Sequence, residues 1–462
     1  MAAFPVKTAL ALLTFTAAMV AIREVSASKG MDKNLGREFL QSMAQFDDDA
    51  TPPLPIMPVK EEGELTPATA RVQTTFLVDD SGALDHFYAA LASAERGEPS
   101  AKVRVVHYGD SPTTADLITG DARQIFQQRF GNAGHGFIFV SKPWAWYQHT
   151  GIDVSGSNWH ITTAVDTTKP TGLGLGGAVF VGAVGASTRF NLHDHYSQIE
   201  IAYESQPQGG DLAVIADGKE VGAVKTAGPA GAPGFQSVSL PAQANKIEVK
   251  VTSGSVRVFG VSFERSGPGV TYDSLGLNGA STIVMSRVFA QRNWAQELRH
   301  RSPDLLIINY GTNEAGFASF VHKQYEEELL MAISKVRAAI PETSILIMSP
   351  MDRGKRNGAS IKTMETIPEI IAIQERVAKE TGCGFFNTFE AMGGDSTMAR
   401  WYEKQPRMVA ADLIHPSPKG ARIVAEAFTK QLMMGFTRYK VRQAPKPHTA
   451  FAQARRAARR QH

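Results

Sequence analysis

The chain has 462 residues, of which 43% are hydrophobic and 20% charged, as is usual for a globular protein. These values exclude a wholly disordered, collagen-like or coiled-coil chain, and the length favours two folded units. The 48 basic and 45 acidic residues leave a formal charge of +3, and the single cysteine, Cys383, excludes an intramolecular disulfide and a cysteine-based metal cluster.

The N-terminus is typical of an exported protein. Lys7 precedes an apolar stretch, 8–22, that is shorter than the ~20 residues of a normal membrane span. The sequence VSA at 25–27 then resembles a signal peptidase site. We therefore expect residues 1–27 to be a signal peptide and the protein to be periplasmic or secreted. An uncleaved N-terminal membrane anchor is the alternative.

Residues 28–72 are predicted to be a disordered linker, because the stretch 47–67 is acidic and rich in proline. Order is expected to begin near Gln73. A short amphipathic helix follows, with apolar residues at helical spacing: Leu84, Phe87, Tyr88 and Leu91.

Strand and helix patterns then alternate on either side of a long interruption. Strands are predicted at 103–107, 270–277, 304–310, 344–348 and 383–387, and the third and fourth of these are continuous apolar runs. Helices are predicted near 118–126, 325–340 and 370–381, and from Pro418 onward. Continuous apolar runs are typical of strands that are buried on both faces. We therefore predict an α/β fold with a doubly wound parallel sheet and helices on both faces, formed by 73–140 and 266–440.

The interruption, residues 141–265, has no helical pattern. Its short alternating segments lie at 198–203, 211–216, 220–224, 246–251 and 256–264. Asp217 and Gly218 separate two of them, which is a strong hairpin signal. We predict an inserted β-sandwich that resembles a carbohydrate-binding module.

Four short motifs lie at ends of the predicted α/β elements, where open α/β sheets bind ligands. Gly109-Asp110-Ser111 follows the first strand, and Asn278-Gly279-Ala280 follows the second. The sequence GTNE at 311–314 follows the third strand. The sequence DLIH at 412–415 precedes the last helix.

Together these motifs contain the groups that acyl transfer requires. A serine hydroxyl needs a base, and a histidine base needs a carboxylate that fixes its tautomer. Ser111, His415 and Asp412 can fill these three roles. The developing oxyanion needs donors, which the backbone amides of Ser111 and Gly279 and the side-chain amide of Asn313 can supply.

The four motifs, in this order, resemble those of the SGNH (GDSL-type) hydrolase family. Two features depart from the family: Pro112 stands where a leucine is common, and the insert separates the first two motifs. The resemblance implies a serine esterase that forms an acyl-enzyme on Ser111 and uses neither a metal nor an organic cofactor. The β-sandwich insert also resembles the architecture of bacterial peptidoglycan O-acetylesterases.

We therefore expect an esterase that removes O-acetyl or other short acyl groups from an envelope or extracellular polysaccharide, with peptidoglycan as the expected polymer. An O-acetyltransferase with the same triad is one alternative, and a non-catalytic polysaccharide-binding protein is another. The expected partner is the acetylated polysaccharide, and no feature predicts nucleic-acid binding. The basic tail, 441–462, is predicted to be disordered and can contact a membrane surface or an anionic polymer.

Two further clusters each allow more than one interpretation. Trp144 and Trp146 lie where the insert begins and can either pack in its core or stack on sugar rings. The sequence HDH at 193–195 resembles a metal site, but without further ligands we do not predict one.

Overall fold

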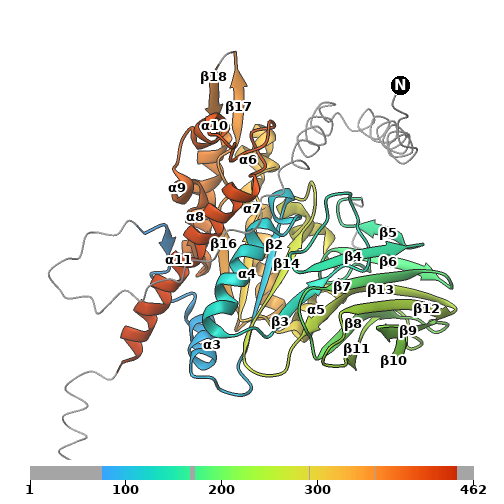
Figure 1. Cartoon of the computed structure of the whole chain (residues 1–462). Helices are drawn as coiled ribbons and strands as arrows, with labels where there is room; N and C mark the ends of the chain where they lie inside the picture. Colours follow the sequence, from blue (N-terminus) through green and yellow to red (C-terminus); the bar gives the residue numbers. More distant parts are fainter. Residues whose placement is uncertain (1–74, 167–171, 291, 359, 445–462) are drawn as a thin grey trace, which may run out of the picture.

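The computed structural model describes residues 75–166, 172–290, 292–358 and 360–444 (Figure 1). The predicted signal peptide, the linker and most of the basic tail lie outside these ranges. Within them, no helix combines the length and the apolarity that a bilayer crossing requires.

The predicted parallel sheet is present. Its parallel strands are β2 (Lys102–Gly109), β14 (Gly269–Gly276), β15 (Leu305–Asn309), β16 (Ser344–Met348) and β19 (Gly384–Phe386). The short β1 (Leu77–Val78) is antiparallel to β19 at one edge. The order β1-β19-β16-β15-β2-β14 places the first parallel strand between the second and the third, which is the flavodoxin-like doubly wound arrangement.

Helices cover both faces of this sheet. One face packs against α3 (Asp85–Glu95), α4 (Leu117–Phe130) and α11 (Pro418–Gln443), and the other against α5 (Asn293–Arg301), α7 (Tyr325–Ala339) and α8 (Thr366–Thr381). Neighbouring strand residues divide between the faces, because successive side chains of a strand point in opposite directions. Thus Val105 lies in the core under α4, whereas Val106 lies in the opposite core.

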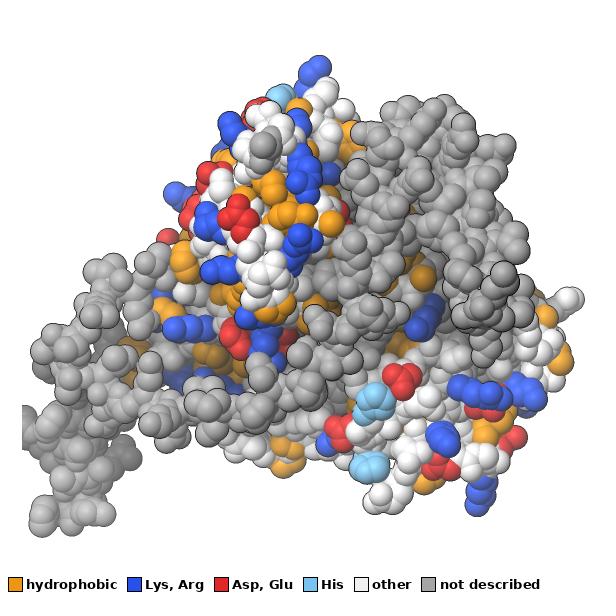
Figure 2. Space-filling view, turned by 45° about the horizontal axis from the view of Figure 1, so that its top comes forward, with side chains coloured by type: hydrophobic (Ala, Val, Ile, Leu, Met, Phe, Trp, Pro, Cys, Tyr) orange, Lys and Arg blue, Asp and Glu red, His pale blue; other side chains and the backbone are white. Residues whose placement is uncertain are grey.

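Shorter elements fill the loops. They are the helices α6 (Ala318–Lys323), α9 (Thr388–Met392) and α10 (Thr397–Glu403), and the hairpin of β17 (Gly354–Asn357) and β18 (Ser360–Thr363). In the view of Figure 2, basic and acidic side chains are interspersed over the described surface. A surface of this kind does not form a single-sign field.

Two antiparallel sheets separate α4 from β14 in the sequence. One has the order β10 (Lys219–Lys225), β9 (Asp211–Ala216), β12 (Lys246–Ser253), β7 (Ser187–Leu192), β4 (Ile152–Ser157). The other has the order β11 (Ala232–Ser239), β8 (Gln198–Ser205), β13 (Ser255–Glu264), β6 (Ala178–Ala183), β5 (His160–Thr163). Figure 1 shows both beside the α/β part of the molecule.

The antiparallel region begins before residue 141, because β3 (Gly134–Ile138) already pairs with β13. The sequence GHGFI of β3 has no alternating pattern, and Gly134 and Gly136 both have positive φ. Glycine is needed at 136 because an added Cβ would lie 2.3 Å from Oδ1 of Asp273 on β14. The strand therefore resembles a loop in sequence.

The boundary expected for the basic tail is too early, since α11 continues to Gln443. The side chain of Lys440 lies 2.8 Å from a carboxylate oxygen of Glu95 on α3, and Arg442 pairs with Asp85 on the same helix. These two basic groups therefore pack on the fold, and only residues beyond 444 remain for the predicted tail.

Candidate active site

Ser111 lies on the turn that follows β2. The strand ends at Gly109, and Ser111 begins a single 3₁₀ turn that ends at Thr113. A side chain does not fit at position 109, because a Cβ on Gly109 would lie 2.2 Å from Oγ1 of Thr113. Ser111 is 9% exposed, so its hydroxyl lies at the surface of a tightly packed turn. The long helix α4 starts only at Leu117.

Asp412 and His415 lie on the loop before α11. The Oδ1 atom of Asp412 accepts hydrogen bonds from the backbone amides of Ile414 (2.9 Å) and His415 (3.1 Å). Leu413 between them is buried and adopts a positive φ of 62°, a conformation that only a closely constrained turn imposes on a leucine. The sequence DLIH thus folds as a tight turn that holds aspartate and histidine on one side.

This turn brings the three predicted groups together. Nδ1 of His415 lies 2.7 Å from Oδ2 of Asp412, and Nε2 of the same ring lies 2.7 Å from Oγ of Ser111. The carboxylate can only accept, so Nδ1 carries the proton and Nε2 is the acceptor for the Ser111 hydroxyl. The ring is therefore in the tautomer that a general base for serine requires.

The charge of Asp412 is maintained in spite of its burial. Burial alone would raise the pKa of this carboxyl, but the hydrogen bond and charge of His415 and the two amide donors of the turn lower it below its usual value. Asp412 is therefore an ionised carboxylate that can stabilise a protonated His415.

The predicted oxyanion donors come from three loops. Gly279, after β14, has a φ of +77°, and no atom lies within 4 Å of a Cβ built there. The Nδ2 amide of Asn313 donates to the carbonyl oxygen of Ala280 at 2.8 Å, which joins the loops after β14 and β15. Among the described residues, no oxygen accepts a hydrogen bond from the backbone amide of Ser111 or Gly279. Both amides are free to bind an oxyanion.

Three charged residues at this site were given no part in the chemistry from the sequence. Glu314 is buried and accepts hydrogen bonds from Thr282 and Gly311. Asp110 is 1% exposed, and burial together with the nearby carboxylate of Glu314 raises its pKa to about 7. Arg353 donates to the carbonyl oxygen of Thr312. The position of Glu314 in the GTNE motif is the one signal that could have identified it.

Arg353 provides positive charge behind the site. Burial lowers the pKa of its guanidinium, and the carboxyl groups of Asp110 and Asp412 oppose that effect. The arginine is only 7% exposed. It follows β16 in a sequence with no recognisable motif, so periodicity alone could not have placed it here.

The tryptophans at the start of the insert are partly buried. Trp144 packs against the hydrophobic core and lies edge-on to Tyr147, with ring centroids 6.0 Å apart. The indole N–H of Trp159 donates to the Ser187 carbonyl, which favours a packing role for that ring. Trp146 is also half-buried. A sugar-binding role of Trp144 and Trp146 stays a prediction.

One group of metal-ligand residue types occurs among the described residues: Asp116, His135 and His149. Asp116, however, forms a buried ion pair with Arg123 at 2.6 Å, and the two imidazoles are hydrogen-bonded to each other. A cation would have to displace both interactions. The HDH sequence does not converge either, since His193 pairs with Asp153.

Residues 251–423 match the GDSL-like lipase/acylhydrolase family. The matched part contains Gly279, Asn313, Asp412 and His415. Ser111 lies outside it, because the insert separates the first motif from the others. No curated protein matches the chain.

Several solved structures are similar. A peptidoglycan O-acetylesterase is 24% identical, with a TM-score of 0.67 over 78% of this chain and 99% of that chain. An acetylxylan esterase mutant from Geobacillus stearothermophilus is 20% identical, with a TM-score of 0.26 over 36% of this chain and 72% of that chain. A Bacillus subtilis protein is 12% identical, with a TM-score of 0.32 over 65% and 98%. The first likeness establishes a shared mixed α/β fold.

Proposed function

We propose that this chain, whose residues 251–423 match the GDSL-like lipase/acylhydrolase family, is a carboxylic ester hydrolase that removes O-acetyl or other short acyl groups from an envelope or extracellular polysaccharide. The observation that carries the proposal is the position of His415, 2.7 Å from both the Ser111 hydroxyl and the Asp412 carboxylate. Peptidoglycan is the first polymer to test, because a structure of the same fold is a peptidoglycan O-acetylesterase.

In the proposed mechanism, Oγ of Ser111 attacks the acyl carbonyl carbon while Nε2 of His415 takes the hydroxyl proton. The negative charge on the carbonyl oxygen is stabilised by the amides of Ser111 and Gly279 and the side chain of Asn313. His415 then gives its proton to the sugar oxygen as the ester bond breaks, leaving an acyl-enzyme.

A water molecule completes the cycle. His415 takes one proton from the water while the water oxygen attacks the carbonyl carbon of the acyl-enzyme. His415 then gives this proton to Oγ of Ser111 as the bond between Oγ and the acyl group breaks. The carboxylic acid is released and Ser111 is regenerated. Asp412 remains ionised throughout and stabilises the charged form of His415 after each proton transfer.

The proposed domain roles follow from this reaction. The α/β part carries the chemistry, and we propose that the two antiparallel sheets form a sandwich that holds the polymer. Residues 1–27 are proposed to direct export, which would place the enzyme in the compartment of an envelope polysaccharide. Trp144 and Trp146 are proposed to contact sugar rings at the start of the insert.

The test compares wild type with Ser111→Ala on p-nitrophenyl acetate and on acetylated peptidoglycan. Loss of the serine nucleophile should lower kcat/KM by roughly 10³-fold or more. Ser360→Ala, on the exposed hairpin strand β18, is the matched control and should retain activity. Turnover by Ser111→Ala equal to wild type would disprove the nucleophile. Ester formed on an added acceptor sugar would identify a transferase instead.

A further inference from the structure

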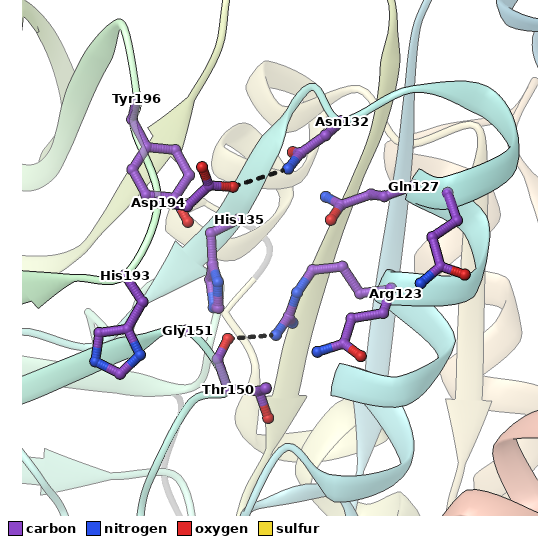
Figure 3. Close-up of a pocket in the computed structure, with 11 residues that line it drawn as sticks. Arg123, Gln127, Asn132, His135, Thr150, Gly151, His193, Asp194 and Tyr196 are labelled. Carbon is purple, nitrogen blue, oxygen red and sulfur yellow. Dashed lines mark hydrogen bonds between the residues drawn. The ribbon is translucent and has the colours of Figure 1, made fainter. Parts of the chain in front are cut away.

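We propose that a cavity between α4 and the loop from β7 to β8 binds one neutral sugar unit of the substrate polymer, an inference that rests on the proposed polysaccharide function. The cavity has a volume of about 350 Å³, a size suited to a small ligand. Figure 3 shows Arg123 and Gln127 of α4 facing His193, Asp194 and Tyr196 across it.

A chain of buried hydrogen bonds on one wall of the cavity determines which ring nitrogens of His149 and His135 carry a proton. The amide of Phe139 donates to the hydroxyl oxygen of Tyr147 at 2.9 Å, and this hydroxyl lies 2.8 Å from Nε2 of His149. Because this tyrosine is buried, its hydroxyl proton needs a protein acceptor, and Nε2 of His149 is the acceptor within reach. His149 must then carry its own proton on Nδ1.

The next bond continues the chain into the cavity. Nδ1 of His149 lies 3.0 Å from Nε2 of His135, so its proton is donated to that nitrogen. The carboxylate of Asp116, 3.8 Å away, is too distant to accept it. His135 therefore accepts on Nε2 and carries a proton on Nδ1. Among the described residues, this Nδ1 has no protein acceptor, although the ring is 3% exposed and lines the cavity. The Nδ1–H group of His135 is thus a fixed hydrogen-bond donor to an oxygen atom of a ligand in the cavity.

The charges around the cavity are already balanced. Arg123 binds both carboxylate oxygens of Asp116, and Asp194 pairs with Arg265 and accepts from Asn132. An anionic or cationic ligand would therefore lack a free counter-charge. A neutral ligand with many hydroxyl or amide oxygens fits this surface better.

The remaining lining supports a sugar. Gln124 and Gln128 project exposed amide groups from α4. Tyr196 also lines the cavity, although it is only 6% exposed because its ring packs on Phe263 and lies under the guanidinium of Arg265. Amides, hydroxyls and one aromatic ring are the groups that hydrogen-bond and pack against a pyranose. The cavity lies beside α4, the helix that follows the Ser111 turn in the chain.

Binding is tested without turnover in the full chain carrying Ser111→Ala, titrated calorimetrically with tri-N-acetylchitotriose. In this background, the double variant Gln124→Ala/Gln128→Ala and the single variant Tyr196→Phe should each lower the association constant at least fivefold, as expected for lost hydrogen bonds. Tyr203→Phe, a half-buried tyrosine of β8 outside the cavity, is the matched control and should bind normally.

Two results would overturn the cavity proposal: no binding to the Ser111→Ala protein, or unchanged affinity in correctly folded cavity variants. A second measurement uses the active enzyme, where the double variant should lose at least five times more kcat/KM on acetylated polymer than on p-nitrophenyl acetate. Equal losses on both substrates would also reject the cavity. The proposed esterase function fails separately, if wild type hydrolyses neither ester.

Discussion

The carboxylate of Glu314 accepts two hydrogen bonds from Thr282, one from the backbone amide and one from the hydroxyl, both at 2.8 Å. Its other oxygen accepts from the amide of Gly311 at 3.1 Å. Thr282 follows Gly279 on one loop, and Gly311 precedes Asn313 on the next. Glu314 therefore fixes the separation of two of the proposed oxyanion donors.

Replacing Glu314 with Gln should impair the reaction. A carboxamide has one acceptor oxygen, so its NH₂ group must face either the Thr282 donors or the Gly311 amide. We expect the loops to shift and kcat on p-nitrophenyl acetate to fall about ten- to hundredfold, with a smaller change in KM, as for a lost oxyanion donor. Steady-state kinetics on folded protein measure this.

Glu297→Gln is the matched control. Glu297 is another buried glutamate, and it accepts from the amide of Leu175 at 3.0 Å. Burial raises its pKa to about 8, so it is largely protonated at neutral pH and resembles glutamine. This variant should retain kcat within about twofold, a change of ~0.4 kcal/mol in the barrier. An equal loss of kcat in both variants would show that Glu314 has no special role in the reaction.

Asp412→Asn should reduce kcat by roughly 10³- to 10⁴-fold, because the amide can donate to Nδ1 of His415 and favour the wrong tautomer. Asp153→Asn removes a carboxylate from another Asp–His pair, formed at 3.0 Å with His193 on the surface, and should have no comparable effect. Kinetics of both variants on the small ester provide the measurement. A modest loss in Asp412→Asn would mean that the turn alone orients His415.

Asp110→Asn should change the pH dependence of stability. The pKa of Asp110 is raised from 3.8 to about 7 by burial and by Glu314, and its Oδ2 atom has no partner among the described residues. A raised carboxyl pKa contributes stability that is complete below about pH 4 and is lost as the pH approaches 7. Wild type should therefore lose stability relative to Asp110→Asn over this window, on the order of 1–3 kcal/mol.

Urea unfolding of wild type and Asp110→Asn at pH 4.5 and pH 8 tests the direction of this stability change. The free energy of unfolding of wild type, minus that of the variant, should be smaller at pH 8. A difference that stays constant, or that grows with pH, would contradict the raised pKa. Asp80→Asn, an exposed carboxyl on the loop before α3, serves as the control and should show a constant difference.

The sequence predicts those parts of the fold that have a strong local pattern, such as a continuous apolar run or a proline in the first turn of a helix. The strand of residues 305–309 is apolar from Leu305 to Ile308 because it is buried on both faces, and α11 begins at Pro418 as its sequence indicates. The strand β3 has no such signal, since its pairing with β13 depends on two glycines that allow close approach: Gly134 to the backbone of Phe263 and Glu264, and Gly136 to Asp273. Tertiary contact, and not local pattern, determines that strand.

The same distinction holds at the site. Ser111, Asp412 and His415 could be predicted because their chemistry and motif order are specific, and they lie together although 304 positions separate Ser111 from His415. Arg353 could not be predicted, because its partners all lie far from it in the sequence: the Thr312 carbonyl oxygen, to which it donates, and the charged groups of Asp110 and Asp412. Electrostatic neighbours of this kind leave no spacing rule in the sequence.

The last prediction concerns the tryptophans at the start of the insert. If Trp144 and Trp146 contact sugar rings, their replacement by alanine should lower kcat/KM on an acetylated polymer about tenfold, equivalent to ~1.4 kcal/mol. The loss on p-nitrophenyl acetate should be at least fivefold smaller, since binding far from the ester contributes only for large substrates.

Trp159→Ala provides the comparison, because the indole of Trp159 is hydrogen-bonded to Ser187 and packs against the core. That variant should lose stability and affect both substrates alike, as expected for a packing defect. Trp144 also contacts the core, so each variant needs its thermal unfolding midpoint beside its kinetics. If Trp144→Ala and Trp146→Ala follow the pattern of Trp159→Ala, both rings are packing residues and the sugar contact should be abandoned.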